Sequence, residues 1–182
     1  AARAKRGEAA EIRAKMNSLN DPEIMEALEE ASQAGVRISL NIRGICCWTP
    51  NTPTGQVRTR IVSIVDRYLE HARIFCFGNA GSPLVYMASA DWMSRNLDRR
   101  VELMVPIENR ELAARVLGIL DACFSDNTQA YVIRADGTSV PVTPAPRSKP
   151  FSMQQHLHEL AHESARSHEL ASRQTLEPHR PK

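Results

Sequence analysis

Apolar and polar residues alternate with a period of two over residues 11–19, which predicts a strand. Asp21 followed by Pro22 is typical of a helix start, and apolar residues then recur at helical spacing until Gly35, which predicts the helix end. Residues 36–42 alternate again. A strand, a helix and a strand within about thirty residues indicate a βαβ unit with two parallel strands.

The middle of the chain predicts a helix and further strands. Apolar residues at helical spacing predict a helix over 60–70, and two apolar runs separated by a glycine-rich turn predict a hairpin of strands over 71–77 and 84–88. Alternation over 99–105 predicts another strand, and an amphipathic pattern over 111–124 predicts a helix. Strands that alternate with helices indicate an α/β domain.

The remaining segments predict loops, a small hairpin and a tail. Residues 48–56 are rich in proline and threonine and predict a loop, and an Asp-Gly turn predicts a hairpin within 129–142. Residues 141–150 contain four prolines and predict a stiff linker. Ser152 is expected to cap a polar helix, and residues 173–182 are expected to be disordered.

Composition is that of an ordinary domain with a tail: 182 residues, 42% hydrophobic and 24% charged. The formal net charge of +2 is too small to indicate nucleic acid or a membrane as a partner, and no apolar run approaches the ~20 residues of a membrane span. The chain opens without a signal-peptide pattern. The cysteines lack zinc-ribbon spacing, so we expect reduced thiols in a cytoplasmic protein, at Cys46, Cys47, Cys76 and Cys123.

A metalloprotease-like motif occurs in the tail, which holds five of the six histidines. His158 and His162 fit H-E-x-x-H, and His168 follows ten residues after the first. The longer zinc-protease pattern needs a glycine where this chain has Ala165, which favours an uninterrupted helix and turns His168 away from the pair. We therefore interpret the motif as part of a solvated helix.

The candidate chemistry centres on one histidine and two arginines. His71 and Arg73 are two residues apart, so they project to the same face if both lie on the predicted strand. Imidazole transfers protons near neutral pH and guanidinium holds a fixed positive charge, a combination that suits phosphate chemistry. Arg43 ends the strand over 36–42, and ligands of open α/β sheets gather beyond the carboxyl ends of strands. Taken alone, each of these residues could instead have an ordinary structural role or be a solvated surface residue, with no part in phosphate chemistry.

The residues around His71 resemble the second half of the phospholipase D superfamily pattern. The pattern consists of H-x-K, a G-S-x-N-like turn, an asparagine and a strand glutamate. Here its parts are His71-Ala72-Arg73, Ala88-Ser89-Ala90-Asp91, Asn96 and Glu102. Arg73 replaces the lysine, and Gly78 stands where that superfamily has an aspartate, which counts against phosphodiesterase chemistry.

Four blocks in order resemble the C-terminal domain of bacterial polyphosphate kinase. They occupy residues 14–19, 43–47, 68–74 and 89–102. The resemblance implies an α/β fold, namely a phospholipase-D-like α/β/α sandwich with a mixed sheet, plus a C-terminal helical tail. The family reversibly transfers the terminal phosphate of ATP to polyphosphate through a phosphohistidine, so the resemblance implies ATP, ADP and inorganic polyphosphate as partners.

The resemblance also implies roles for particular residues. Arg43 and His71 correspond to nucleotide-binding positions, and His71 is the expected catalytic partner of a nucleophile in a preceding domain. Mg²⁺ is expected to be held mainly by preceding domains, and we assign no metal ligand in this chain. The candidates for phosphate or polyphosphate contact are Lys15, Asn17, Asn79, Ser89, Arg60, Arg67, Arg73, Arg95, Arg99 and Arg100.

These expectations define a domain organisation. Residues 1–145 form the catalytic domain, with 1–9 as the remnant of a preceding element, and 146–182 form the linker, the polar helix and the disordered tail. The preceding domains are expected as partners in a full-length homo-oligomer without a membrane span, and the chain alone is expected to be inactive. The alternatives are a non-catalytic polyanion-binding module and a phospholipase-D-type phosphodiesterase.

Overall fold

A computed structural model describes residues 1–49 and 59–174, and its described strands form one mixed sheet. The order across the sheet is β6-β5-β4-β1-β2-β3-β7-β8. Most of the loop predicted over 48–56, and the tail beyond residue 174 that was expected to be disordered, lie outside the described residues. The strands are β1 (Glu11–Met16), β2 (Arg37–Ile42), β3 (Thr59–Ile64), β4 (Ile74–Phe77), β5 (Leu84–Ala88), β6 (Met104–Pro106), β7 (Ala130–Ile133) and β8 (Ser139–Pro141).

The predicted βαβ unit is confirmed at the centre of the sheet. β1 pairs with β2 in parallel, and α2 (Pro22–Gln33) connects them. The Asp21 side chain accepts a hydrogen bond of 3.0 Å from the Ile24 N–H and so caps the helix. Gly35 has φ +94, a left-handed conformation that suits glycine just beyond a helix end.

The helix predicted over 60–70 is wrong, because residues 59–64 form β3, which lies parallel to β2. Ile61 and Val62 are both fully buried although they point to opposite faces of the sheet. A strand covered on both faces carries a continuous apolar run, and such a run also fits a helical pattern. Residues 65–73 then form a segment without helix or strand that leads to β4.

The hairpin of β4 and β5 is confirmed, although β4 begins at Ile74 and leaves His71 and Arg73 outside the strand. A 3₁₀ turn, η1 (Asn79–Gly81), connects the two strands. The strand predicted over 99–105 is largely wrong, because α3 (Ser94–Arg99) occupies its start and β6 begins only at Met104. The second hairpin, β7 and β8, is confirmed.

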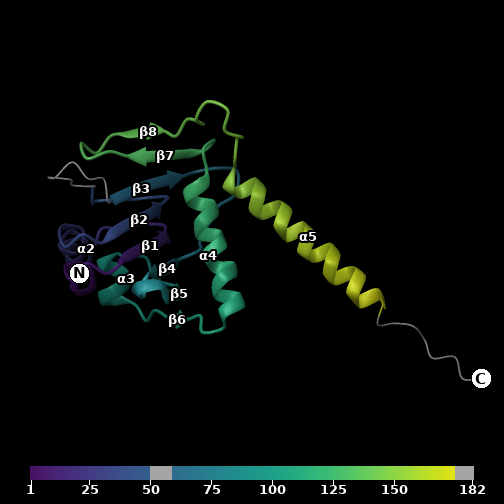
Figure 1. Ribbon diagram of the computed structural model, residues 1–182, viewed down its shortest axis with the longest axis horizontal. Coiled ribbons are helices and arrows are strands. Elements are labelled where there is room, and N and C mark those ends of the chain that lie inside the picture. The colour runs from purple at the N-terminus through teal and green to yellow at the C-terminus, as the bar shows by residue number, and fades with distance from the viewer. Residues whose placement is uncertain (50–58, 175–182) are drawn as a thin grey trace, which may run out of the picture.

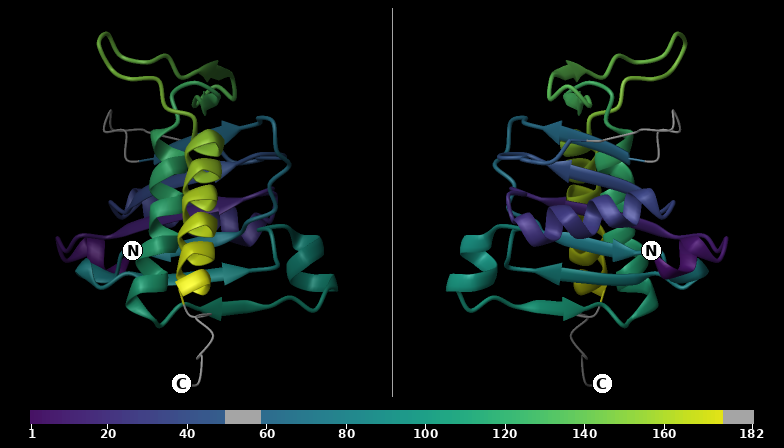
Figure 2. Two further views of the ribbon diagram at one scale, coloured as in Figure 1. Left: turned by 90° about the vertical axis from the view of Figure 1, so that its right-hand side faces the viewer. Right: turned by 90° about the vertical axis from the view of Figure 1, so that its left-hand side faces the viewer.

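Helices cover both faces of the sheet, which confirms the α/β/α sandwich. Figure 2 shows α2 on one face, with α4 (Arg110–Ser125) and α5 (Met153–Gln174) on the other. α1 (Ala2–Lys5) lies near the N-terminus. α5 packs against α4 near its start, and its remainder projects from the body of the domain (Figure 1). No helix in the described residues is long and apolar enough to cross a membrane.

The start of α5 is fixed to the core. Gln155 donates its N–H to the Ser152 hydroxyl at 3.3 Å, which confirms the predicted cap. Met153 is fully buried, and its N–H donates to the Asp126 carboxylate at 2.8 Å. The helix continues through Ala165, as the absence of a glycine there predicted.

Candidate functional site

The phosphate-site candidates gather at one edge of the sheet. β1, β2 and β3 end at this edge, and β4 begins there because it runs antiparallel to β1, with Lys15 opposite Ile74. We call it the site edge and define it by Asn17, Arg43, the segment 71–73 and Ser89. In Figure 2, α3 lies beyond the site edge and α1 lies beyond the opposite edge.

Asp91 is the centre of a hydrogen-bond network at the site edge. Its carboxylate accepts two hydrogen bonds from the Arg73 guanidinium, at 3.2 and 3.0 Å. It also accepts the Asn17 backbone N–H at 2.7 Å and the Asn17 side-chain amide at 3.3 Å. The side chains of Asp91 and Arg73 are 9% and 19% exposed, so the pair is largely withdrawn from solvent.

The environment of Asp91 keeps it ionised. Burial on its own would raise the pKa of this carboxyl, but the hydrogen bonds from Arg73 and from the Asn17 backbone outweigh burial, and the net pKa is lowered. The charge of Arg73 is thereby offset inside the domain. Arg73 also donates to the His71 carbonyl at 2.9 Å, so it fixes the segment that carries the histidine.

Arg43 lies beside this network and lacks a carboxylate partner among the described residues. Its guanidinium donates to the Asn17 side-chain oxygen at 2.8 Å. Gly44 allows the two loops to approach, because it donates its N–H to the Asn17 carbonyl at 2.7 Å and a Cβ there would lie 3.0 Å from the same oxygen. Arg43 therefore offers an oriented positive charge that no acid in the described part of the chain neutralises.

His71 is exposed, in the segment 65–73 between β3 and β4. The neighbouring Glu70 forms an ion pair of 2.5 Å with Lys15, which is only 4% exposed, so this ammonium is engaged inside the domain. A cavity of about 470 Å³ adjoins His71 and is lined by Lys15, Tyr68, Glu70, Met153, Leu157 and His158, among others. Tyr68 and His158 stack in it with ring centroids 6.1 Å apart.

Gln154, in the first turn of α5, is a residue that sequence reasoning missed. Its side chain hydrogen-bonds the backbone of Tyr68 and the carboxylate of Glu70. The residue is 6% exposed. No local signal indicated this contact, because it joins positions more than eighty residues apart in the sequence.

A second network joins the other residues of the phospholipase-D-like pattern. Glu102 accepts hydrogen bonds from the Ser89 hydroxyl and the Asn96 amide. These two bonds lower the pKa of Glu102. Ser89 also accepts the Leu103 N–H at 2.9 Å, so it holds the approach to β6.

Two of the other candidates lie away from the site edge, and the remaining four are exposed arginines on the same side as the site edge. Arg60 is the second residue of β3, toward the opposite edge, and Asn79 lies in η1 at that opposite edge. Arg95, Arg99, Arg100 and Arg67 are exposed, the first two on α3 and the last over the Tyr68 ring at 5.3 Å.

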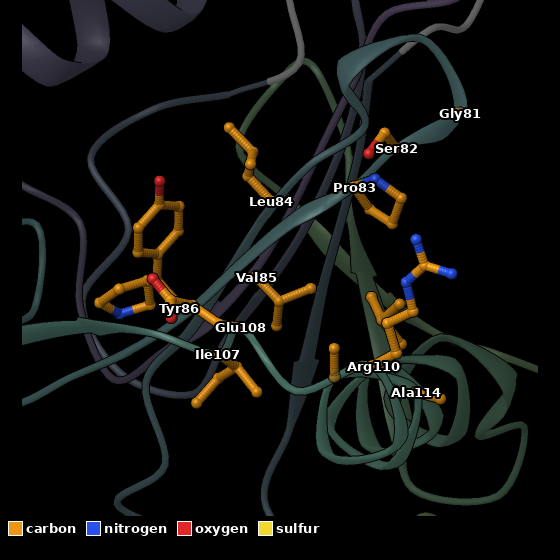
Figure 3. Close-up of a pocket in the computed structure, with 13 residues that line it drawn as sticks. Gly81, Ser82, Pro83, Leu84, Val85, Tyr86, Ile107, Glu108, Arg110 and Ala114 are labelled. Carbon is orange, nitrogen blue, oxygen red and sulfur yellow. The ribbon is translucent and has the colours of Figure 1, made fainter.

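A cavity of about 710 Å³ also lies toward the opposite edge, between η1, β5 and α4 (Figure 3). Ser82 and Tyr86 line it from the hairpin, and Arg110 lines it from α4. None of the residues predicted from the sequence to contact phosphate belongs to its lining.

Metal-binding residue types do not gather in the part of the chain that the structure describes. No group of three or more His, Cys, Asp or Glu residues there could hold a metal ion. His158 and His162 face each other with ring centroids 4.4 Å apart on the exposed part of α5, and two imidazoles alone do not complete a zinc site.

Known proteins provide the comparison for this geometry. A family model described as "Polyphosphate kinase C-terminal domain 2" matches residues 1–154. The polyphosphate kinase of Rhodopirellula baltica is 42% identical over 179 residues, which cover 98% of this chain and 21% of that protein. The chain thus spans about a fifth of the length of this curated relative.

Solved structures of related proteins agree with the sequence comparisons. The crystal structure of polyphosphate kinase from Porphyromonas gingivalis superposes with a TM-score of 0.84 at 35% identity, over 91% of this chain and 25% of that one. Nuc from Salmonella typhimurium, a phospholipase D family member, has a TM-score of 0.51 at 17% identity, over 72% of this chain and 86% of that one, and shows the shared fold. The resemblance drawn from the four sequence blocks is confirmed, and the chain belongs to the polyphosphate kinase C-terminal domain family.

Proposed function

We propose that this chain forms the nucleotide-phosphate side of a polyphosphate kinase active site, in which the terminal phosphate of ATP passes reversibly to polyphosphate. The observation that carries the proposal is a continuous set of hydrogen bonds from Arg43 through Asn17, Asp91 and Arg73 to the backbone of His71. It holds the two residues expected to bind nucleotide at one sheet edge. Phosphoryl transfer depends mainly on positioning and charge, and the network provides both.

Each residue has a distinct proposed role. Arg43 neutralises phosphate oxygens, because its charge has no carboxylate partner in the described residues and Asn17 orients its planar group. His71 donates a proton to, or binds, the transferred phosphate, since its exposed imidazole can act as a hydrogen-bond donor or as a general acid. Arg73 positions His71, because its guanidinium is engaged by Asp91 and by the His71 carbonyl.

The rest of the chemistry is assigned outside this chain. The phosphorylated histidine and the Mg²⁺ ligands are proposed to lie in preceding domains, as the family resemblance implies. The roles proposed for Arg43, His71 and Arg73 rest on their own charge, hydrogen bonds and exposure. Mg²⁺ would supply positive charge that offsets the charge of the phosphates.

The test is mutagenesis in a full-length polyphosphate kinase that carries this domain. His71→Ala and Arg43→Ala should each lower polyphosphate synthesis from ATP by at least about a hundredfold with the melting temperature retained. Arg37→Ala is the matched control, because it removes an exposed arginine at the start of β2, at the opposite edge, and should leave activity close to wild type. Near-normal activity of both site variants would remove the proposal.

Three other outcomes separate the alternatives. The 182-residue chain should make no polyphosphate from ATP; synthesis by the chain alone would show that its nucleophile lies within it. A polyanion-binding module predicts salt-sensitive polyphosphate binding with no effect of His71→Ala on the full-length enzyme. A phosphodiesterase predicts His71-dependent cleavage of a nucleic acid or phospholipid substrate.

A further inference from the structure

We propose that Gln154, in the first turn of α5, is a positioning residue for His71, so that the C-terminal helix is a working part of the phosphate site. The inference rests on the proposed role of His71 and adds a residue from beyond the sheet. Its starting point is the segment 65–73, which lacks helix and strand and carries the exposed histidine.

Gln154 binds this segment at three points. Its side-chain oxygen accepts the Tyr68 N–H at 2.7 Å, and its amide nitrogen donates to the Tyr68 carbonyl at 2.8 Å. The same nitrogen donates to the Glu70 carboxylate at 2.6 Å. One amide group therefore satisfies both backbone groups of Tyr68 and also holds the side chain that directly precedes His71.

Both partners in these contacts, Glu70 and the start of α5, are themselves fixed to the core. Glu70 is held from the sheet by the ion pair with buried Lys15. α5 is held by buried Met153, whose N–H donates to Asp126, a side chain that also accepts three backbone N–H groups of residues 128–130. Gln154 thus holds a segment without helix or strand against the fixed start of α5.

The two flanks of His71 are then fixed independently. Arg73 binds the His71 carbonyl from the C-terminal side, and the Gln154–Glu70–Lys15 contacts hold the N-terminal side. Without Gln154 one flank loses its tie to α5, and the imidazole samples positions away from the phosphate. A displacement of about 1 Å from the reactive geometry can lower a rate by about a hundredfold.

The three contacts of Gln154 require an amide side chain. A glutamine supplies an acceptor and donors on one planar group, and all three contacts use them. Methionine fills a similar volume without these groups, so Gln154→Met releases the segment while retaining the packing of α5. Gln155→Met is the matched control, because Gln155 is exposed and its side chain bonds only to Glu159 on the same helix in the described structure.

The experiment measures both the segment and the reaction. In a full-length enzyme carrying this domain, Gln154→Met should lower kcat about ten- to a hundredfold and leave the KM for ATP within about twofold, while Gln155→Met should change neither. Hydrogen exchange at the Tyr68 amide should accelerate in Gln154→Met and stay unchanged in the control. Wild-type kcat in a variant whose Tyr68 amide exchanges faster would overturn the proposal, as would an unchanged exchange rate.

A second variant keeps the test independent of folding losses. Gln154→Glu places a carboxylate against Glu70 and should lower kcat at least as much as Gln154→Met. Adding Glu70→Gln removes the repulsion but also breaks the ion pair of Glu70 with buried Lys15, so kcat should stay below wild type; full recovery would contradict the anchoring role of that ion pair. If His71→Ala is inactive and Gln154→Met retains wild-type kcat, only this inference fails, whereas a fully active His71→Ala removes the proposed function beneath it.

Discussion

Replacing Asp91 by asparagine removes the charge at the centre of the site-edge network. The variant keeps the shape of the side chain but offers one acceptor where the carboxylate accepted four hydrogen bonds, and its NH₂ group faces donors. Arg73 is then left with an uncompensated, mostly buried charge. Breaking a buried pair costs about 3–5 kcal/mol, and because Arg73 retains 19% exposure we expect the low end, about 3 kcal/mol.

The assay is urea unfolding of the 182-residue chain followed by circular dichroism, for Asp91→Asn, Arg73→Met and the double variant. The double-mutant cycle should give a coupling free energy of about 2 kcal/mol. Arg6→Met provides the control, because it removes an exposed ion pair with Glu8 and should leave the free energy of unfolding unchanged.

The contribution of Asp91 to the stability of the folded chain should depend on pH. The pKa of Asp91 is lowered in the folded chain, whereas an unfolded aspartate titrates near about 3.9. The stabilisation by this carboxylate is therefore complete above that value, and it is lost as the pH falls through the lower folded pKa. The stability gap between wild type and Asp91→Asn should accordingly shrink in acid. A coupling free energy near zero at pH 7, or a gap that widens in acid, would refute the account of the network.

Two further outcomes follow from the site edge and its surroundings. Gly44→Ala places a methyl group 3.0 Å from the Asn17 carbonyl oxygen and should therefore displace Arg43. We expect this displacement to raise the KM for ATP of a full-length enzyme about tenfold. An unchanged KM would show that the close approach of the two loops is not needed. Burial raises the pKa of Cys123 to about 12, whereas Cys47 is exposed. A thiol reagent at pH 8 should therefore label Cys47 quickly and Cys123 only after unfolding, which peptide mass spectrometry can measure. Rapid labelling of Cys123 in the folded chain would contradict the packing of α4.

Local sequence signals predicted the βαβ unit, both hairpins and α4, because caps, turns and periodicity act over a few residues. The Asp21 cap and the left-handed Gly35 are examples in which one residue defines a boundary. β3 was mistaken for a helix because burial on both faces removes the alternation that identifies a strand. Its β-branched residues Ile61, Val62 and Ile64 were the signal that should have decided for a strand.

The sequence suggested candidate residues but not their contacts. The structure places His71, Arg43 and Asn17 at one edge of the sheet, where the ends of the parallel strands meet, and their contact with phosphate stays a prediction. His71 and Arg73 were expected to share a strand face, but both precede β4, and Arg73 faces Asp91 instead. Contacts such as this one join side chains across distant segments, and only the folded chain brings them together.

The most direct test of the central claim is to locate where phosphate binds. The isotope-labelled 182-residue chain would be titrated with tripolyphosphate while its backbone amide chemical shifts are followed by NMR. We expect saturable, salt-sensitive shifts that cluster at Asn17, Arg43, His71 and Ser89, with none at Asn79 on the opposite edge. Shifts that cluster at the opposite edge, or that spread evenly over the surface, would contradict it.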